Sequence, residues 1–521
     1  MICSVYIIGL KKSDIYGALL RLNQPDIRRK VMFNKSIKSK RRYSRRLAAI
    51  FMAGMIMLTG CGKTGSANNA GNETPSESPT LVNPTTEIQP TENQSTENPA
   101  TEDQSSGNET TGLQSSKEPA AQKEISTKTV LLGANMEQGK VDLPSPDEEK
   151  KFIDGTADFS FELMKLVLEN EKGNNVMVSP ISIINALGMT ENGATSQTLT
   201  EMEKVLGKGM ARDEYNRALS AYCKSLKDEE AEFSNANSIW IKEGIVVKDG
   251  FIQNCKDYYD SEIYQAPFDS STIDDINNWG YNNTNGLVEK TIDDIDKEAI
   301  MYLINALYFE AEWKKEYSKD DINENAVFTD KDGNEDKVAM LSSKESCYFT
   351  LDDGIGFRKP YKGDKYSFVG ILPAEGKSPE EYMSEIKGND FIATVTNPDY
   401  SKEVYVKIPE FSADYRTSLR NVLMDMGMET AFSNADFSEM FDLSSVDGNG
   451  ADISDVFHNT HIDVDRKGTR AAATTAVEMK SYEAVEEKAV VYITLDKPFV
   501  YMIIDNETGL PVFMGTCNDI K

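Results

Sequence analysis

Two histidines, His458 and His461, are the first candidates for metal binding or acid–base chemistry in this chain of 521 residues. The alternation through Ile462 and Val464 favours a strand, and a spacing of three on a strand sends the two imidazoles to opposite faces. On a helix they would pair, but on a strand they do not share one zinc ion. A catalytic triad would need a serine on a sharp turn, yet no G-x-S-x-G occurs. The sequence therefore predicts neither a metal site nor an enzyme.

Three short motifs resemble ligand-binding loops but fail on spacing. G-K-T at 62–64 lacks the first glycine of a phosphate loop, because Met57 stands at that position. Residues 330–334 and 447–450 resemble calcium loops, but neither has a glycine at the sixth position. We interpret both as hairpin turns, since Asp, Asn and Gly favour turns. The sequence indicates no cofactor.

The tract 469–481 has a period of two, which is typical of a strand with one buried and one solvated face. Its odd positions are small or apolar and uncharged, whereas its charges, Arg470, Glu478 and Lys480, all lie at even positions. Gly468 opens the tract and three alanines follow, and these residues are poor strand formers. A segment patterned as a central strand, yet built of small residues, indicates a loop that is able to enter a sheet.

This tract resembles the hinge and reactive-centre loop of the serpins, the serine protease inhibitors, in which a glycine and a threonine precede a run of small residues. Further motifs resemble serpin segments in the family's order. They are N-N-V-M-V-S-P-I-S at 174–182, N-A-L-Y-F-E-A-E-W at 305–313, V-K-I-P-E-F at 406–411, L-M-D-M-G-M at 423–428, A-F at 431–432, P-F-V-Y-M-I at 498–503 and P-V-F-M-G at 511–515. The resemblance runs from about residue 158 to residue 521.

The resemblance implies an α+β protein with the serpin fold, namely three β-sheets, eight or nine helices and an exposed reactive-centre loop. It also implies three groups of site residues. They are a hinge of Gly468, Thr469, Ala471, Ala472, Ala473 and Thr474, a shutter of Ser179, Ser182, Asn305 and His458, and a breach, where insertion begins, at Trp313. Without the resemblance, His458 would be interpreted as a hydrogen-bonded core histidine and Trp313 as an ordinary core tryptophan.

In the family the residue before the cleaved bond lies 14 positions after the hinge glycine, which implies a reactive bond between Tyr482 and Glu483. An aromatic residue there suits chymotrypsin-like or subtilisin-like serine proteases. Cleavage after Lys480 would instead suit trypsin-like enzymes. The implied mechanism is a covalent trap that consumes the inhibitor, with cysteine proteases as a second class of partner. A non-inhibitory serpin acting as a surface binding module is the alternative function.

Two residues depart from the pattern of inhibitory serpins, which usually carry acidic residues at these places. They are Arg470, directly after the hinge threonine, and Arg466, two positions before Gly468. The alternation places Arg470 on the solvent face of an inserted strand, where it does not block insertion. Arg466 is expected to alter a salt bridge at the hinge.

Residues 1–60 form a predicted lipoprotein signal segment. Seven Lys/Arg between residues 35 and 46 precede an apolar run at 47–58 that is too short to span a membrane. L-T-G-C at 58–61 resembles a bacterial lipobox, which implies a lipid on Cys61, and Met32 is an alternative start of ordinary length. We therefore expect the protein at the bacterial cell surface, anchored to the membrane through that lipid and facing outward.

Residues 61–150 are predicted to be a disordered tether, because Gly62 to Lys150 contains Thr, Glu, Asn, Ser and Pro but no aromatic residue. A flexible chain of ~80 residues spans roughly 50 Å. Residues 1–60 carry 13 Lys/Arg and 2 Asp/Glu, so their removal lowers the formal net charge from −29 to −40. Such an acidic chain will not bind nucleic acid nonspecifically.

Residues 151–521 are predicted to form one domain that is monomeric. Its four scattered cysteines, Cys223, Cys255, Cys347 and Cys517, are not a disulfide framework, although one bridge stays open. Periodicity predicts elements of both kinds. Helices are expected at 156–169, 181–189, 199–206, 251–259, 273–283 and 419–426, and strands at 236–241, 300–309, 366–372, 404–408, 461–465, 490–495 and 500–504.

Overall fold

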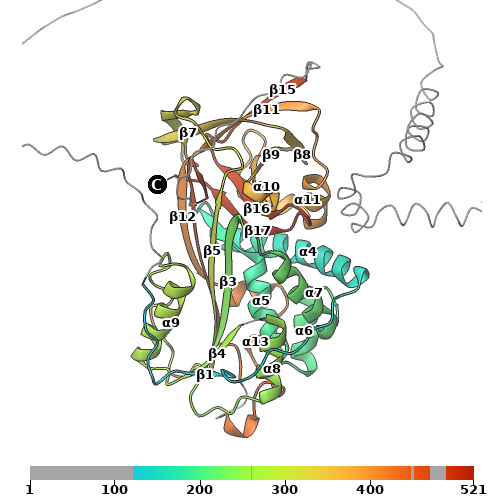
Figure 1. Cartoon of the computed structure of the whole chain (residues 1–521), viewed down its shortest axis with the longest axis vertical. Coiled ribbons are helices and arrows are strands. Elements are labelled where there is room, and N and C mark those ends of the chain that lie inside the picture. The colour runs from blue at the N-terminus through green and yellow to red at the C-terminus, as the bar shows by residue number, and fades with distance from the viewer. Residues whose placement is uncertain (1–120, 260, 447–450, 470–487, 521) are drawn as a thin grey trace, which may run out of the picture. The chain divides into compact units, whose positions relative to one another are not determined.

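The structure is a computed structural model that describes residues 121–259, 261–446, 451–469 and 488–520. These residues form three β-sheets and ten α-helices (Figure 1). The α+β serpin architecture expected from the sequence is therefore confirmed. The described residues contain ten α-helices, whereas eight or nine were predicted. The extra count includes α13, which is a single turn of four residues.

The sheets contain seven, six and four strands among the described residues. In spatial order the seven-stranded sheet holds β1 (Val130–Leu132), β4 (Glu262–Ala266), β3 (Ala231–Lys242), β5 (Met301–Glu312), β14 (Gly468–Thr469), β13 (Asp455–Val464) and β12 (Phe411–Ser418). The six-stranded sheet holds β2 (Val176–Val178), β17 (Pro511–Cys517), β16 (Phe499–Asp505), β10 (Tyr366–Leu372), β9 (Gly354–Pro360) and β8 (Cys347–Leu351). The four-stranded sheet holds β15 (Ala489–Thr494), β11 (Lys402–Pro409), β7 (Glu335–Glu345) and β6 (Ile322–Thr329).

The helices gather mainly around the end of the molecule opposite the four-stranded sheet (Figure 1). They are α4 (Pro146–Asn170), α5 (Pro180–Glu191), α6 (Ser196–Leu206), α7 (Arg212–Ser225), α8 (Asp249–Tyr259), α9 (Ser270–Asn283), α10 (Pro379–Glu385), α11 (Gly388–Val395), α12 (Arg420–Asp425) and α13 (Glu429–Phe432). Local sequence explains their starts. Ser145 caps α4 with Glu148 in a reciprocal capping box, and Ser179 caps α5 ahead of Pro180.

Two apolar clusters lie on opposite faces of β5, because successive side chains of a strand alternate. Leu303, Leu307 and Phe309 belong to the main core, which also includes the six-stranded sheet and α5. Ile304 and Ala306 belong to a smaller cluster with Trp240 of β3 and with α9. The helix α9 therefore covers one face of β3 and β5, and the main core covers the other.

The domain begins earlier than the sequence predicted. Residues 121–150, assigned to the tether, pack on the domain: β1 pairs with β4 along three residues, and α4 begins at Pro146. Ser126 and Thr129 both donate hydrogen bonds to the carboxylate of Asp275 on α9. Aromatic residues are absent from this segment, yet backbone pairing with an existing sheet edge orders it. The rest of the tether and the signal segment lie outside the described residues.

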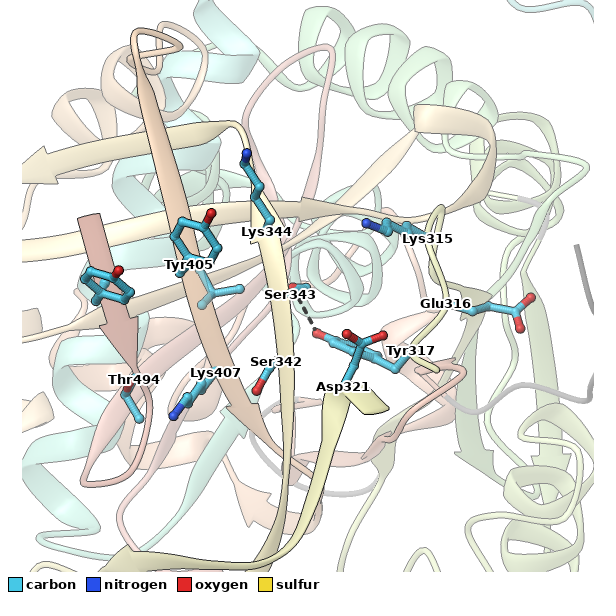
Figure 2. Close-up of a pocket in the computed structure, with 12 residues that line it drawn as sticks. Lys315, Glu316, Tyr317, Asp321, Ser342, Ser343, Lys344, Tyr405, Lys407 and Thr494 are labelled. Atoms are coloured by element: carbon cyan, nitrogen blue, oxygen red, sulfur yellow. Dashed lines mark hydrogen bonds between the residues drawn. The ribbon is translucent and has the colours of Figure 1, made fainter. Parts of the chain in front are cut away.

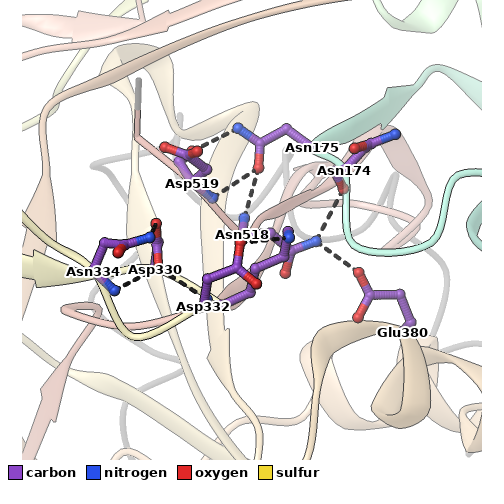
Figure 3. Close-up of polar contacts among 9 residues, drawn as sticks. Asn174, Asn175, Asp330, Asp332, Asn334, Glu380, Asn518 and Asp519 are labelled. Atoms are coloured by element: carbon purple, nitrogen blue, oxygen red, sulfur yellow. Dashed lines mark hydrogen bonds and ion pairs between the residues drawn. The ribbon is translucent and has the colours of Figure 1, made fainter.

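The end of the chain is held by a cluster of amides at the end of β17 (Figure 3). The Oδ1 atom of Asn175 accepts hydrogen bonds from the backbone N–H groups of Asn518 (2.6 Å) and Asp519 (3.1 Å). Asn518 in turn donates through Nδ2 to the carbonyl of Asn174 (2.9 Å) and to Glu380 Oε1 (2.6 Å). These hydrogen bonds connect the residues after β17 to the residues before β2 and to α10.

The turn at 330–334 is a hairpin between β6 and β7, as predicted. Asp330 Oδ1 accepts from the backbone N–H groups of Asp332 (2.9 Å) and Asn334 (2.8 Å), so its side chain closes the turn (Figure 3). The turn predicted at 447–450 lies outside the described residues. All four predicted domain cysteines are free thiols. No helix among the residues the structure describes is both long and apolar enough to cross a membrane.

Candidate functional site at the hinge of the seven-stranded sheet

The two-residue strand β14 lies between β5 and β13 at one end of the seven-stranded sheet. Gly468 and Thr469 pair antiparallel with Glu312 and Ala311 of β5, and Thr469 also pairs with Val464 of β13. These are the first two residues of the tract whose alternation predicted a loop able to enter a sheet. The structure therefore places the start of that tract inside the sheet.

Gly468 is required by the close approach of β14 to β5. A Cβ atom at this position would stand 2.1 Å from the carbonyl oxygen of Ala311. That oxygen belongs to the backbone, so it cannot move aside as the end of a flexible side chain could. The next residue, Thr469, is only 1% exposed, and its Oγ1 lies 2.6 Å from the phenol oxygen of Tyr361. The hinge thus enters the sheet through a position that accepts no side chain, followed by one buried hydroxyl that has a partner.

Trp313 holds the turn that leads into β14. Its backbone N–H donates to the carbonyl of Lys467 (2.8 Å), and its indole Nε1–H donates to the carbonyl of Asp465 (2.9 Å). Its ring stacks on Tyr361 with centroids 4.6 Å apart and planes at 8°. The side chain is fully buried, so the predicted breach residue and the hinge turn form one packed unit.

Arg466 does not lack an acidic partner, although it departs from the pattern seen in inhibitory serpins. Its guanidinium makes two parallel hydrogen bonds to the carboxylate of Glu410, at 2.7 Å each, and a third to Glu324 at 3.0 Å. The hydrogen bond to Glu410 is the largest cause that raises the pKa of Arg466. Paired, planar contacts of this kind fix orientation as well as charge, so Arg466 anchors the turn before the hinge.

The four predicted shutter residues converge where β5 and β13 meet α5. The backbone N–H of Ser179 donates to His458 Nε2 (3.0 Å), and His458 Nδ1 lies 3.3 Å from Asn305 Oδ1. Asn305 Nδ2 donates to the carbonyl of Ser182 (3.4 Å) and to Asn237 Oδ1 (2.5 Å). All four predicted residues are fully buried.

The hydrogen bonds define the protonation state of His458. Because Nε2 accepts from Ser179, the neutral ring carries its proton on Nδ1 and donates it to Asn305. Burial lowers the pKa of His458 to about 3, so the ring is neutral near pH 7. His461 lies between Asp414 and Asp463, on the opposite face as predicted, and the hydrogen bond to Asp463 is the main cause that raises its pKa.

The shutter lies at the point where the pairing of β5 with β13 ends. These strands pair in parallel from Tyr302 to Ile304 and from Asp455 to Phe457. Asn305 and His458 directly follow those stretches. Beyond them, β14 separates the two strands at the far end. The strands β5 and β13 thus pair directly at one end of the sheet and are separated by β14 at the other. The side-chain hydrogen bonds of the shutter lie between these two regions.

Comparison with known proteins agrees with this geometry. Residues 154–520 match the family model described as serpin (serine protease inhibitor). The chain belongs to the serpin family. It is 31% identical over 385 residues to an uncharacterized serpin-like protein of Thermococcus kodakarensis, a match that covers 72% of this chain and 87% of the relative. Neuroserpin of Gallus gallus is 27% identical and matches 72% of this chain and 93% of its own.

Solved structures give the same result. The native state of the thermophilic serpin tengpin matches with a TM-score of 0.70 and 39% identity, covering 75% of this chain and all of the solved chain. The latent state of the same protein matches with a TM-score of 0.62. As members of an inhibitor family, serpins bind target proteases and are not catalysts, so the prediction that this chain is not an enzyme is confirmed.

Several predicted site residues of this serpin lie outside the described residues. They are Ala471, Ala472, Ala473 and Thr474 of the hinge, Tyr482 and Glu483 of the reactive bond, and the lipidation site Cys61. Sequence reasoning also missed Tyr361, Glu410 and Asn237, which complete the hinge and the shutter. Only Asn237 left a signal, because four of the five residues at 234–238 are Ser or Asn, directly before the apolar run at 239–241.

Proposed function

We propose that this serpin inhibits serine proteases by a covalent trap and is consumed once. The position of β14 carries the proposal, because a hinge already seated between β5 and β13 marks the register for the rest of the tract. Continued one residue at a time, that register puts Ala471 opposite Phe309 and Thr475 opposite Asn305. The odd positions of the tract then face the main core, and none of them is charged.

The chemistry follows from the reactive bond at Tyr482–Glu483. The protease serine Oγ attacks the carbonyl carbon of Tyr482, the bond to the nitrogen of Glu483 breaks, and the serine proton passes to that leaving amine. An ester then joins the protease to Tyr482. Once cut, the tract is free to insert between β5 and β13, which carries the attached protease away before water cleaves the ester.

The same register gives Arg470 a role. It would stand opposite Glu310, whose neighbour on β3 is Glu232. Burial is the main cause that raises the pKa of Glu232, and Glu310 raises it further. An inserted arginine beside two carboxylates relieves their repulsion, so its charge favours insertion in this chain.

The aromatic side chain of Tyr482 points to chymotrypsin-like or subtilisin-like targets, and the segment ending at Cys61 points to lipid anchorage on the outer face of a bacterial membrane. The test of inhibition is to mix the purified chain with a panel of serine and cysteine proteases. A 1:1 complex that survives boiling in detergent is the expected result. Complete cleavage of the chain without any such complex would overturn the proposal.

A further inference from the structure

A lysine buried inside the domain lies behind the hinge turn. The side chain of Lys359, in β9, is only 1% exposed. Its Nζ atom donates hydrogen bonds to Glu345 Oε1 of β7 (3.1 Å) and to the carbonyl of Lys315 (3.4 Å). Burial lowers the pKa of Lys359, and the carboxylate of Glu345 opposes this effect. Lysine is almost never fully buried unless it is paired, so Glu345 is the partner that allows a lysine at this position.

The ammonium group of Lys359 also lies against two aromatic rings. Its Nζ atom is 4.4 Å from the ring centre of Tyr317 and 5.1 Å from that of Trp313. The planes of these two rings are at 89° to each other, and their centres are 6.5 Å apart. A cation within about 6 Å of a ring centre is attracted to the ring, most strongly where water is excluded. Lys359 therefore contacts the segment 313–317 at three points, namely two rings and the carbonyl between them.

The partners of this lysine are themselves fixed by the four-stranded sheet. Ser343 of β7 donates through Oγ to Glu345 Oε1 (2.7 Å). The same Oγ atom lies 3.4 Å from the phenol oxygen of Tyr317 (Figure 2). Ser343 and Glu345 belong to the four-stranded sheet, whereas Lys359 belongs to the six-stranded sheet. The buried ion pair therefore joins these two sheets.

The two aromatic residues beside Lys359 hold the turn that leads into the hinge. Trp313 donates its backbone N–H and its indole N–H to the first and last carbonyls of the turn 465–467. Tyr317 donates its backbone N–H to the carbonyl of Arg466 (3.4 Å). Each carbonyl of the turn thus accepts a hydrogen bond from a residue whose ring faces the ammonium group of Lys359.

We propose that Lys359 is a positioning residue for loop insertion. This inference rests on the proposed function. The ammonium group holds the rings of Trp313 and Tyr317 in place, and these two residues hold the turn that keeps β14 between β5 and β13. After cleavage, insertion competes with hydrolysis of the ester that joins the protease to the chain. A hinge already held at its entrance inserts sooner, so fewer inhibitor molecules are lost as cleaved substrate.

The test separates the charge of Lys359 from its contribution to packing. Lys359→Met keeps an unbranched side chain of similar length but leaves the carboxylate of Glu345 without its lysine, so this single variant is expected to melt at a lower temperature. Lys359→Met combined with Glu345→Gln removes both charges and keeps a hydrogen-bond acceptor for Ser343. Replacing a buried ion pair by neutral side chains of similar volume often leaves stability unchanged, so the double variant should melt near the parental temperature.

Two measurements on the full-length double variant concern the hinge. In the free chain, the amides of Gly468 and Thr469 should exchange with solvent about tenfold faster, whereas the amides of β10 should exchange at the parental rate. Against a protease that the parent chain traps, the stoichiometry of inhibition should rise at least twofold. A residue that only stabilised the core would change neither quantity once the melting temperature is restored.

The matched control removes an ion pair that joins two helices. Arg217 of α7 pairs with Glu148 of α4, and 27% and 15% of these two side chains are exposed. Arg217→Met combined with Glu148→Gln makes the same kind of change, and glutamine still serves in the capping box of α4. Hinge exchange and the stoichiometry of inhibition should both keep their parental values in this control.

Every other outcome contradicts the inference. A parental value of either hinge quantity in the double variant would overturn it while the proposed function stands, and so would an equal change in the helix control. A double variant that does not fold would overturn it as well, because the pair would then be a requirement of the core. Absence of any covalent complex from the parent chain would overturn the proposed function and the role in insertion, even if hinge exchange still responded to the charge of Lys359.

Discussion

The phenol oxygen of Tyr361 lies 2.6 Å from the hydroxyl oxygen of Thr469, and both side chains are buried. Tyr361 follows β9 of the six-stranded sheet, whereas Thr469 is the second residue of the hinge. One buried hydrogen bond therefore connects the hinge, which lies in the seven-stranded sheet, to the end of a strand of the six-stranded sheet. Four predictions concern the hinge and the sheet around it, and one concerns the reactive bond.

Tyr361→Phe is expected to loosen the hinge. The variant leaves the Thr469 hydroxyl buried without this partner, at a cost of about 1–3 kcal/mol. The amides of Gly468 and Thr469 should then exchange with solvent at least tenfold faster. Tyr382→Phe is the matched control, because Tyr382 donates to the carbonyl of Leu351, away from the hinge. Equal exchange at the hinge in parent and variant would show that the hydrogen bond does not hold it.

Thr469→Arg is expected to convert the inhibitor into a substrate. Thr469 is 1% exposed, so the arginine would bury a charge without a partner, which costs several kcal/mol. Insertion should stall while the acyl-enzyme is hydrolysed, so the stoichiometry of inhibition should rise steeply. Thr469→Ser keeps the hydroxyl and should remain inhibitory. Detergent-stable complexes formed by the arginine variant at the parental stoichiometry would contradict the inward assignment.

Arg470→Glu is expected to slow loop insertion. In the proposed register it would put a third carboxylate beside Glu310 and Glu232, and like charges directly opposite each other destabilise a sheet. The double variant Arg470→Glu with Glu310→Arg should restore the parental stoichiometry of inhibition, because it reverses the order of the charges. If the single variant inhibits as the parent does, the register is wrong.

The stability of the shutter is expected to fall in acid. His458 has a pKa near 6.5 when unfolded and about 3 when folded, so only the unfolded chain binds its proton between these values. The free energy of unfolding should then fall as pH drops below 6.5, by at most about 1.4 kcal/mol per pH unit. Denaturant unfolding at several pH values measures the slope.

Two matched variants distinguish the contributions of His458 and His461 to this pH dependence. His458→Asn should flatten that acid slope. His461→Gln should leave the slope below pH 6.5 unchanged but lower the free energy of unfolding there, because the folded pKa of His461 is raised, so its contribution is fully present below pH 6.5 and is lost as pH rises through the folded value. An identical slope in the parent and in His458→Asn would exclude His458 as the acid-sensitive group.

Tyr482 is expected to set the choice of target. Mass spectrometry of the peptide released from a protease complex should find Glu483 at its N-terminus, whereas Ser481 there would assign the bond to Lys480. Tyr482→Arg should then shift inhibition from chymotrypsin-like to trypsin-like enzymes without lowering the melting temperature. A variant that still prefers chymotrypsin would show that another residue precedes the cleaved bond.

Much of the element pattern was predictable from local sequence. The helices predicted at 156–169, 181–189 and 273–283 lie within α4, α5 and α9, and the strands predicted at 300–309 and 461–465 overlap β5 and β13, although α4 begins ten residues and β13 six residues before the predicted start. The sequence pattern did not reveal α7, α10, α11 or the single-turn helix α13. It also missed β1, whose three apolar residues stand in a polar segment and are ordered by pairing with β4.

By itself the sequence determined which residues are able to enter a sheet: a glycine, then small residues with every charge on one face. The tertiary structure decided where the hinge enters, because Thr469 takes its place between Ala311 and Val464, one of them 158 positions away. It also decided the shutter, whose Ser179 and His458 are 279 positions apart. Hydrogen bonds between such distant residues depend on how the strands pack, and local patterns carry no record of that packing.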